Sequence, residues 1–280
     1  MTPAHSACGE IARGQDPDRY VCALFAEPPE REALFAVLAF NHEVAKTRDV
    51  ISETMLGQIR LQWWREAIDR ILAGTPRQHE VVQPLAEAFQ RFDLDRGPFD
   101  EILDAREADL EDAPFASLED MVAYGQATAG ALGRIMLRIL GDDTASALEA
   151  AQAASTAWAL TGLLRSVPFH ARVKRLMLPR DLLHRHGATI GDYNEFRDTP
   201  ALRAVVQAIA MAAGDAIETA RSTKGASVKR AAPVLLQARL ARLYLDRLER
   251  AGFNAFDPAV NADMPLKAWS LWWGRFTGRV

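Results

Sequence analysis

The chain has 280 residues, 49% of them apolar, and a formal net charge of −4. A chain of this length and composition can bury one sizeable hydrophobic core. Its slightly negative net charge excludes a general electrostatic attraction to nucleic acid or anionic lipid, so any basic patch has to be local. Two cysteines, Cys8 and Cys22, make no disulfide framework and suit a reducing compartment. No apolar run approaches the ~20 residues of a membrane span, and the first residues carry no export signal. We therefore expect a cytoplasmic protein.

In chain order, residues 1–15 are predicted to be a flexible tail and residues 16–280 a single domain. Apolar residues at a spacing near 3.6 predict a series of helices. The first ones begin at Asp18, Glu30, Ser52, Glu80 and Pro98. Later helices are predicted over 118–140, 144–167, 200–221 and 233–250, and Ser117 with Asp120 resembles a capping box. No alternating strand pattern is visible, so the predicted fold class is all-α.

Residues 158–182 combine an apolar helix face with a basic run. Pro168 should stop or kink this helix, because proline has no N–H to donate and clashes with the preceding turn. The basic side chains that follow are Arg172, Lys174, Arg175 and Arg180.

This stretch resembles a motif of the squalene and phytoene synthases, QLTNxLRDVxEDxxRGRxYLP. The matching residues are Leu160-Thr161, Leu164-Arg165, Val167, Arg172, Arg175 and Leu178-Pro179. In that family the two aspartates of the motif are implied to hold Mg²⁺ against a substrate diphosphate, because Mg²⁺ prefers carboxylate oxygens. This chain has Ser166 and His170 there, a neutral hydroxyl and an imidazole that suits softer metals.

A second family motif, AFCRxVDDxxD, resembles residues 39–49. Ala45 and Lys46 stand where its leading acids would be, and only the last acid, Asp49, is kept. Glu43 and Asp49 remain as acidic contacts, with a solvated helix end as the alternative. The sequence thus predicts two emptied carboxylate sites, no metal and no catalytic residue.

Three further segments resemble the family. Residues 57–67 match its RLxWWRxEL helix, and one of the two tryptophans is expected in the core. Residues 103–110 match IDGMxxDL. Asp104, Glu107 and Glu111 share one face of this helix, and like charges at this spacing repel mildly. We therefore expect a positively charged partner among Arg172, Lys174 and Arg175; the alternative is an acidic face that is only solvated.

Residues 124–133 resemble the helix YxxxVAGxVG that lines the prenyl cavity. Tyr124, Gly130 and Gly133 are therefore candidate cavity residues, because a glycine inside a helix costs roughly 1 kcal/mol relative to alanine and needs a reason. Close packing of a neighbouring helix is the alternative. Arg165, Ser166, His170, Arg172 and Arg175 complete the ligand-binding candidates, with a hydrogen-bonded packing role as the alternative for His170.

The C-terminal residues 265–280 are rich in tryptophan and contain no acid. As a helix they would place Trp269, Trp272, Trp273 and Phe276 on one face, as in an interfacial membrane helix or a partner contact. The alternative is a helix docked on the bundle that hides its tryptophans.

The resemblance implies an isoprenoid-synthase-like helical bundle with a central cavity. Within the superfamily, the lost acids resemble the branch of complex I assembly factors and their bacterial relatives. This resemblance implies a catalytically degenerate protein that needs no cofactor. It would act by binding a protein partner, either a subunit of a respiratory complex or an assembly intermediate. It could also bind an isoprenoid or lipid ligand and contact the inner face of the membrane peripherally. The alternative is a divergent Mg²⁺-dependent prenyltransferase that condenses farnesyl or geranylgeranyl diphosphate. A third hypothesis is a protein that binds and carries a lipid or prenyl diphosphate without catalysing a reaction.

Overall fold

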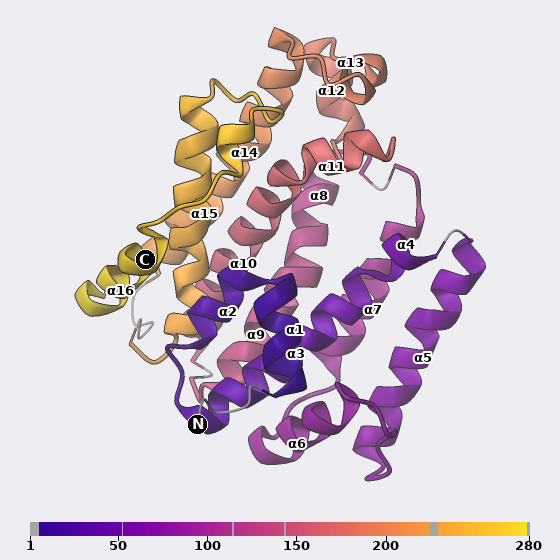
Figure 1. Ribbon diagram of the computed structural model, residues 1–280, viewed down its shortest axis with the longest axis vertical. Coiled ribbons are helices and arrows are strands. Elements are labelled where there is room, and N and C mark those ends of the chain that lie inside the picture. The colour runs from indigo at the N-terminus through magenta and orange to yellow at the C-terminus, as the bar shows by residue number, and fades with distance from the viewer. Residues whose placement is uncertain (1–5, 52, 114, 143, 224–228, 279–280) are drawn as a thin grey trace.

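The computed structural model describes residues 6–51, 53–113, 115–142, 144–223 and 229–278, and these residues form an all-α domain (Figure 1). The first half contains α1 (Ala7–Gln15), α2 (Pro17–Ala23), α3 (Pro28–Ala45), α4 (Thr47–Val50), α5 (Thr54–Leu72), α6 (Val82–Phe92), α7 (Gly97–Glu107) and the 3₁₀ turn η1 (Ala108–Leu110). The middle contains α8 (Leu118–Gly125), η2 (Gln126–Gly130), α9 (Ala131–Ile139), α10 (Ala145–Arg165) and α11 (Val167–Arg172). The last part contains α12 (Arg180–His186), α13 (Ile190–Asn194), α14 (Pro200–Ser222), α15 (Ala232–Arg250), η3 (Pro258–Val260) and α16 (Lys267–Thr277).

Helix α10 lies at the centre of the domain and contacts α8, α9, α14 and α15. Its buried residues include five alanines: Ala147, Ala150, Ala151, Ala154 and Ala157. Small side chains let neighbouring helices approach closely on several sides, and the close-packed interior gains dispersion contacts. The alanine-rich sequence therefore makes α10 the core helix.

The N-terminal segment corrects one prediction. Of the predicted tail 1–15, residues 1–5 lie outside the described residues, and residues 7–15 form α1, where Ser6 accepts a hydrogen bond from the Gly9 amide and Cys8 and Ala12 are buried. Helix α1 packs on α3 because its small residues fit against that helix. The next helix is capped by Asp16 rather than by Asp18, and the predicted cap Ser52 lies outside the described residues.

The segment α8–η2–α9 is one rod that contains a π-helical turn. The predicted capping box is present: Ser117 Oγ accepts from the Asp120 amide at 3.1 Å, and Asp120 accepts from the Ser117 amide at 3.0 Å. The π turn covers Gln126–Gly130 and faces α10. Such turns often occur at functional sites because they change the direction of the following side chains.

Helix α14 is long and apolar enough to cross a membrane by length and composition, which corrects the expectation that no such stretch exists. It instead packs along α10 and also contacts α12 and α15, and its buried residues include Leu202, Val206, Ile209 and Ala213. A core helix passes the same test, since it is also rich in apolar residues.

Candidate functional site

The first emptied carboxylate position lies at the end of α3. Glu43 forms ion pairs with Lys46 and with Arg60 of α5, whose Nη2 is 2.8 Å from Glu43 Oε2. Asp49 of α4 is exposed and, within the described residues, makes no ion pair. The one sheltered carboxylate here is thus already neutralised by two cationic side chains.

The second emptied position is the junction of α10 and α11. Helix α10 ends at Arg165, Ser166 joins the two helices, and Pro168 lies in the first turn of α11, as expected from its missing N–H. His170 is buried on α11, whereas Arg172 is exposed and makes no ion pair within the described residues. Arg172 is therefore not part of the buried contacts here, and its place in a ligand site stays a prediction.

Arg165 also lies elsewhere than predicted. Its Nε donates to Asn261 at 3.1 Å, and its guanidinium sits 3.5 Å above the ring of Tyr244. It pairs at 3.4 Å with Asp18, a carboxylate that is 5% exposed and also binds Tyr244 and Lys267. Arg165 therefore joins α10 to α2, to α15 and to Asn261 after η3, and it has no partner in common with Arg175.

A polar cluster forms around Asp109 of η1. The Tyr124 hydroxyl donates to its carboxylate at 2.8 Å, and Arg106 and Arg175 pair with it at 3.0 and 3.2 Å. Arg175 also donates to the Asp109 carbonyl at 3.0 Å. Two guanidinium groups around one carboxylate leave one positive charge in excess, in a region where Asp109 and Tyr124 are buried.

Burial sets the protonation states in and beside this cluster. Burial, followed by the charge of Arg175, lowers the pKa of His170 to about 4, so its imidazole is neutral near neutral pH. Burial also raises the pKa of Tyr124. For Arg106 burial opposes the charge, but Tyr124 and Asp109 outweigh it and the pKa is raised.

Some polar atoms here are not satisfied by the protein. His170 Nδ1, Arg106 Nε and Arg175 Nε are buried and have no hydrogen-bond partner among the described residues. Buried polar atoms without a partner are costly, so such a site favours a polar or anionic guest. The arrangement can hold an anion by charge-assisted hydrogen bonds.

The residues do not fit Mg²⁺. Among the described residues no three Asp, Glu, His or Cys side chains come together as a ligand set. Glu43 and Asp109 are each bound by two cationic side chains, which compete with any divalent cation for the carboxylate oxygens. Metal-assisted departure of a diphosphate cannot be derived from these side chains.

The acidic face of α7 has a different partner from the predicted ones. Asp104 and Glu107 pair with Arg65 of α5 at 2.7 and 2.8 Å. Arg65 belongs to the RLQWWREA segment, in which Trp64 is 1% exposed and Trp63 is partly buried, as expected for one core tryptophan. The basic run after α11 supplies Arg175 to Asp109 instead.

The glycines of the rod pack against α10. A Cβ on Gly133 would lie 2.3 Å from Ser155 Oγ, so the alternative of close helix packing holds at this position. Gly130 faces Gln152 and Thr156, which also line a groove of about 550 Å³ between η2, α10 and α14. Another groove, of about 710 Å³, lies between α1, α3 and α6. Neither is lined by Tyr124 or His170, so a ligand cavity at the site stays a prediction.

Two central residues, Arg106 and Asp109, were absent from the predicted site. Asp109 is the last acid of the segment that resembles IDGMxxDL, so the motif itself held the signal. The charge pattern drew attention to Asp104 and Glu107, which are exposed. Arg60, the partner of Glu43, is the first residue of the segment that resembles RLxWWRxEL, but that motif does not indicate which carboxylate it binds.

Residues 12–272 match the family model described as Squalene/phytoene synthase. The chain is 29% identical over 269 residues to NADH dehydrogenase (ubiquinone) complex I, assembly factor 6 from Homo sapiens, covering 95% of this chain and 81% of that protein. It is 31% identical over 194 residues to presqualene diphosphate synthase from Rhodopseudomonas palustris, covering 68% of this chain and 67% of the enzyme.

Solved structures show the same fold. A dehydrosqualene synthase in complex with ligand superposes with a TM-score of 0.83 at 19% identity, covering 97% of this chain and 94% of that chain. Squalene synthase HpnC from Alicyclobacillus acidocaldarius gives a TM-score of 0.78 at 21% identity, covering 88% and 93%. At these identities the likeness concerns the fold alone.

Proposed function

Because this chain belongs to the squalene/phytoene synthase family, we propose that it has kept the family scaffold and acts by partner binding in the assembly of respiratory complex I, without transferring prenyl groups. The family contains both prenyltransferases and proteins like assembly factor 6. The partner would be a subunit or an assembly intermediate of the complex. Its place would be the cytoplasm, next to the inner face of the membrane.

The observation that supports this proposal most directly is the set of side chains that replace the acids at the two motif positions. Prenyl diphosphate ionisation in this family needs carboxylates that hold metal ions, and metal ions stabilise the departing charge. Here Lys46 and Arg60 bind Glu43, while a serine and a buried neutral histidine occupy the second position. Similarity to assembly factor 6 over most of the chain gives the direction of the proposal.

The test is a deletion strain complemented with two versions of the gene. Loss of the gene should lower the amount of assembled complex I on native gels and NADH:quinone activity in membranes, and the wild-type gene should restore both. Asp49→Asn should restore them equally, because the exposed Asp49 has no structural partner within the described residues. Normal complex I in the deletion strain would overturn the proposal.

One observation favours a second candidate, a divergent prenyltransferase: the 31% identity to presqualene diphosphate synthase. This candidate requires diphosphate release when the purified protein is incubated with farnesyl or geranylgeranyl diphosphate and Mg²⁺. It also requires Asp49→Asn to abolish that release, since Asp49 is the acid left at the first motif. A synthase with intact motifs serves as the positive control. Tight binding of the diphosphate without release would indicate a carrier.

A further inference from the structure

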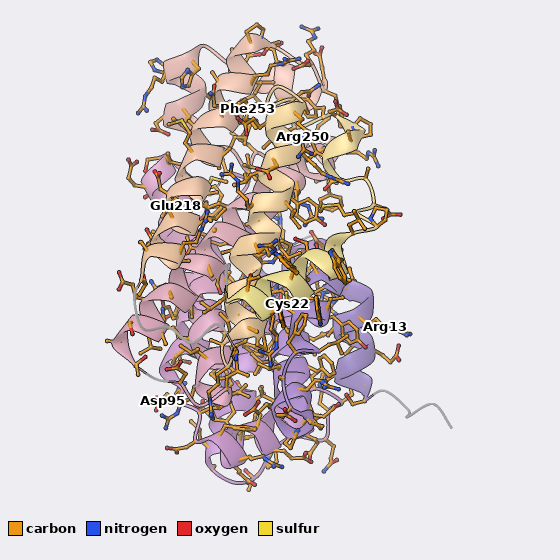
Figure 2. All side chains as sticks on the ribbon, turned by 90° about the vertical axis from the view of Figure 1, so that its left-hand side faces the viewer. Arg13, Cys22, Asp95, Glu218, Arg250 and Phe253 are labelled. Carbon is orange, nitrogen blue, oxygen red and sulfur yellow. The ribbon has the colours of Figure 1, made fainter. Side chains whose placement is uncertain are left out.

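Helix α16 exposes an aromatic surface, defined here as Trp269, Trp272, Trp273 and Phe276. These side chains are 61, 46, 48 and 68% exposed. The alternative of a helix docked on the bundle is therefore right about the docking and wrong about the tryptophans, which are not hidden. Figure 1 shows α16 at the edge of the molecule beside α15, and Figure 2 shows it crossing α15 near Cys22 of α2. Large aromatic groups gathered on one exposed face commonly mark an interaction surface.

The helix is held firmly by its other side. Leu271 and Gly274 are buried against the bundle, and Ser270 accepts a hydrogen bond from Arg239 of α15 at 2.9 Å. Lys267 pairs with the buried Asp18, and Arg275 donates to the Lys229 carbonyl at 2.8 Å. These contacts fix the helix so that its aromatic face must point outward.

The aromatic rings are also ordered among themselves. Trp269 stacks on Trp272 with ring centres 5.1 Å apart, and Trp272 stacks on Phe276 at 5.5 Å. A surface that is ordered before binding loses less conformational entropy when it binds. The stack therefore forms a preformed apolar ridge.

The charges beside the ridge are basic. Within the described residues, Lys229, Arg239 and Arg275 form no ion pair, and α16 contains no acidic residue. The nearest acid before the helix in the sequence is Asp263. This local excess of positive charge contrasts with the net charge of −4 of the whole chain and matches an anionic surface.

We propose that α16 binds the surface of an anionic lipid bilayer, with its aromatic ridge in the interfacial layer and the positive charge of Lys229, Arg239 and Arg275 attracting the anionic headgroups. Tryptophan suits this layer because its ring is apolar and its N–H can still reach water. With 11 residues the helix is too short to span a bilayer, so it lies in the surface plane. The inference does not depend on a role in complex I assembly.

The test uses the purified full-length protein and lipid vesicles. We expect cosedimentation with vesicles of phosphatidylcholine mixed with phosphatidylglycerol, weaker binding to phosphatidylcholine alone, and weaker binding at high salt. Brominated lipid should quench tryptophan fluorescence, because the ridge enters the bilayer whereas Trp64 stays in the core.

The variant Trp269→Ser/Phe276→Ser removes the two most exposed rings and should weaken vesicle binding by about tenfold or more. The matched control is Met55→Ser/Ile59→Ser, which removes two apolar side chains of α5 that are 66 and 58% exposed. This control should bind like the wild type.

Three results would overturn the proposal. One is the absence of binding to either kind of vesicle. Another is equal binding by the Trp269→Ser/Phe276→Ser variant, or an equal loss in the α5 control. The third combines two observations: the wild type does not bind vesicles, and the Trp269→Ser/Phe276→Ser variant changes its oligomeric state in light scattering. This result would assign the ridge to contact with a second copy of the chain.

Discussion

Replacing His170 with Asn should remove a pH-dependent weakness of the fold. His170 is 9% exposed, and its folded pKa of about 4 lies below its ordinary value of 6.5, first because of burial and second because of Arg175. Between these two values the unfolded chain binds a proton that the folded protein excludes. The contribution of neutral His170 to the free energy of unfolding is therefore fully present above pH ~6.5, and it is lost as the pH falls toward about 4.

The two pKa values set the magnitude. Each pKa unit corresponds to about 1.4 kcal/mol, so the complete loss is about 3 kcal/mol. Between about pH 7 and pH 5 roughly 2 kcal/mol of it should be lost. This loss is a substantial fraction of the roughly 5–15 kcal/mol stability of a typical domain, so it is measurable.

The assay is urea unfolding at the two pH values, followed by circular dichroism. The wild type should lose about 2 kcal/mol more than His170→Asn on going from about pH 7 to pH 5. His186→Asn, at an exposed position, should keep the wild-type pH dependence. If His170→Asn and the wild type lost stability in parallel, the reasoning from burial would be refuted.

Asp18→Asn should cost about 1–3 kcal/mol in urea unfolding, because it removes the buried carboxylate shared by the partly exposed Arg165 and Lys267, whereas Asp263→Asn, at an exposed position, should be nearly neutral. Gly133→Ala should destabilise by about 1–3 kcal/mol, because its Cβ would meet Ser155. Gly214→Ala, also inside a helix but with nothing within 4 Å of the new Cβ, should stabilise by about 0.5–1 kcal/mol. A melting temperature for Gly133→Ala at or above that of Gly214→Ala would contradict the packing argument.

Local rules predicted much of the fold. The capping box at Ser117, the break before Pro168 and the all-α class depend on residues three or four apart, and the structure confirms them. Where the local signal was weak, the prediction was wrong. Helix α1 is short and forms because its small buried face packs on α3.

The sequence predicted the positions where the metal-binding acids of the family are missing. It could not predict which arginine pairs with which carboxylate in the candidate site. The loss of acids at Lys46 and His170 is visible in the sequence. Arg175 and Asp109, however, are 66 residues apart, and Arg165 and Asp18 are 147 apart. An arginine can reach any carboxylate that the fold brings near it, so sequence spacing does not select the pair.

By itself, the sequence determined the helical periodicity, the family resemblance and the absence of the metal-binding acids, because each depends on residue identity and short spacing. Only the tertiary structure decided which arginine binds which carboxylate and which face of α16 is covered. The physical reason is that ion pairing and burial depend on distances between segments far apart in the chain. The same helix could have hidden its tryptophans, but Leu271 and Gly274 occupy the bundle side.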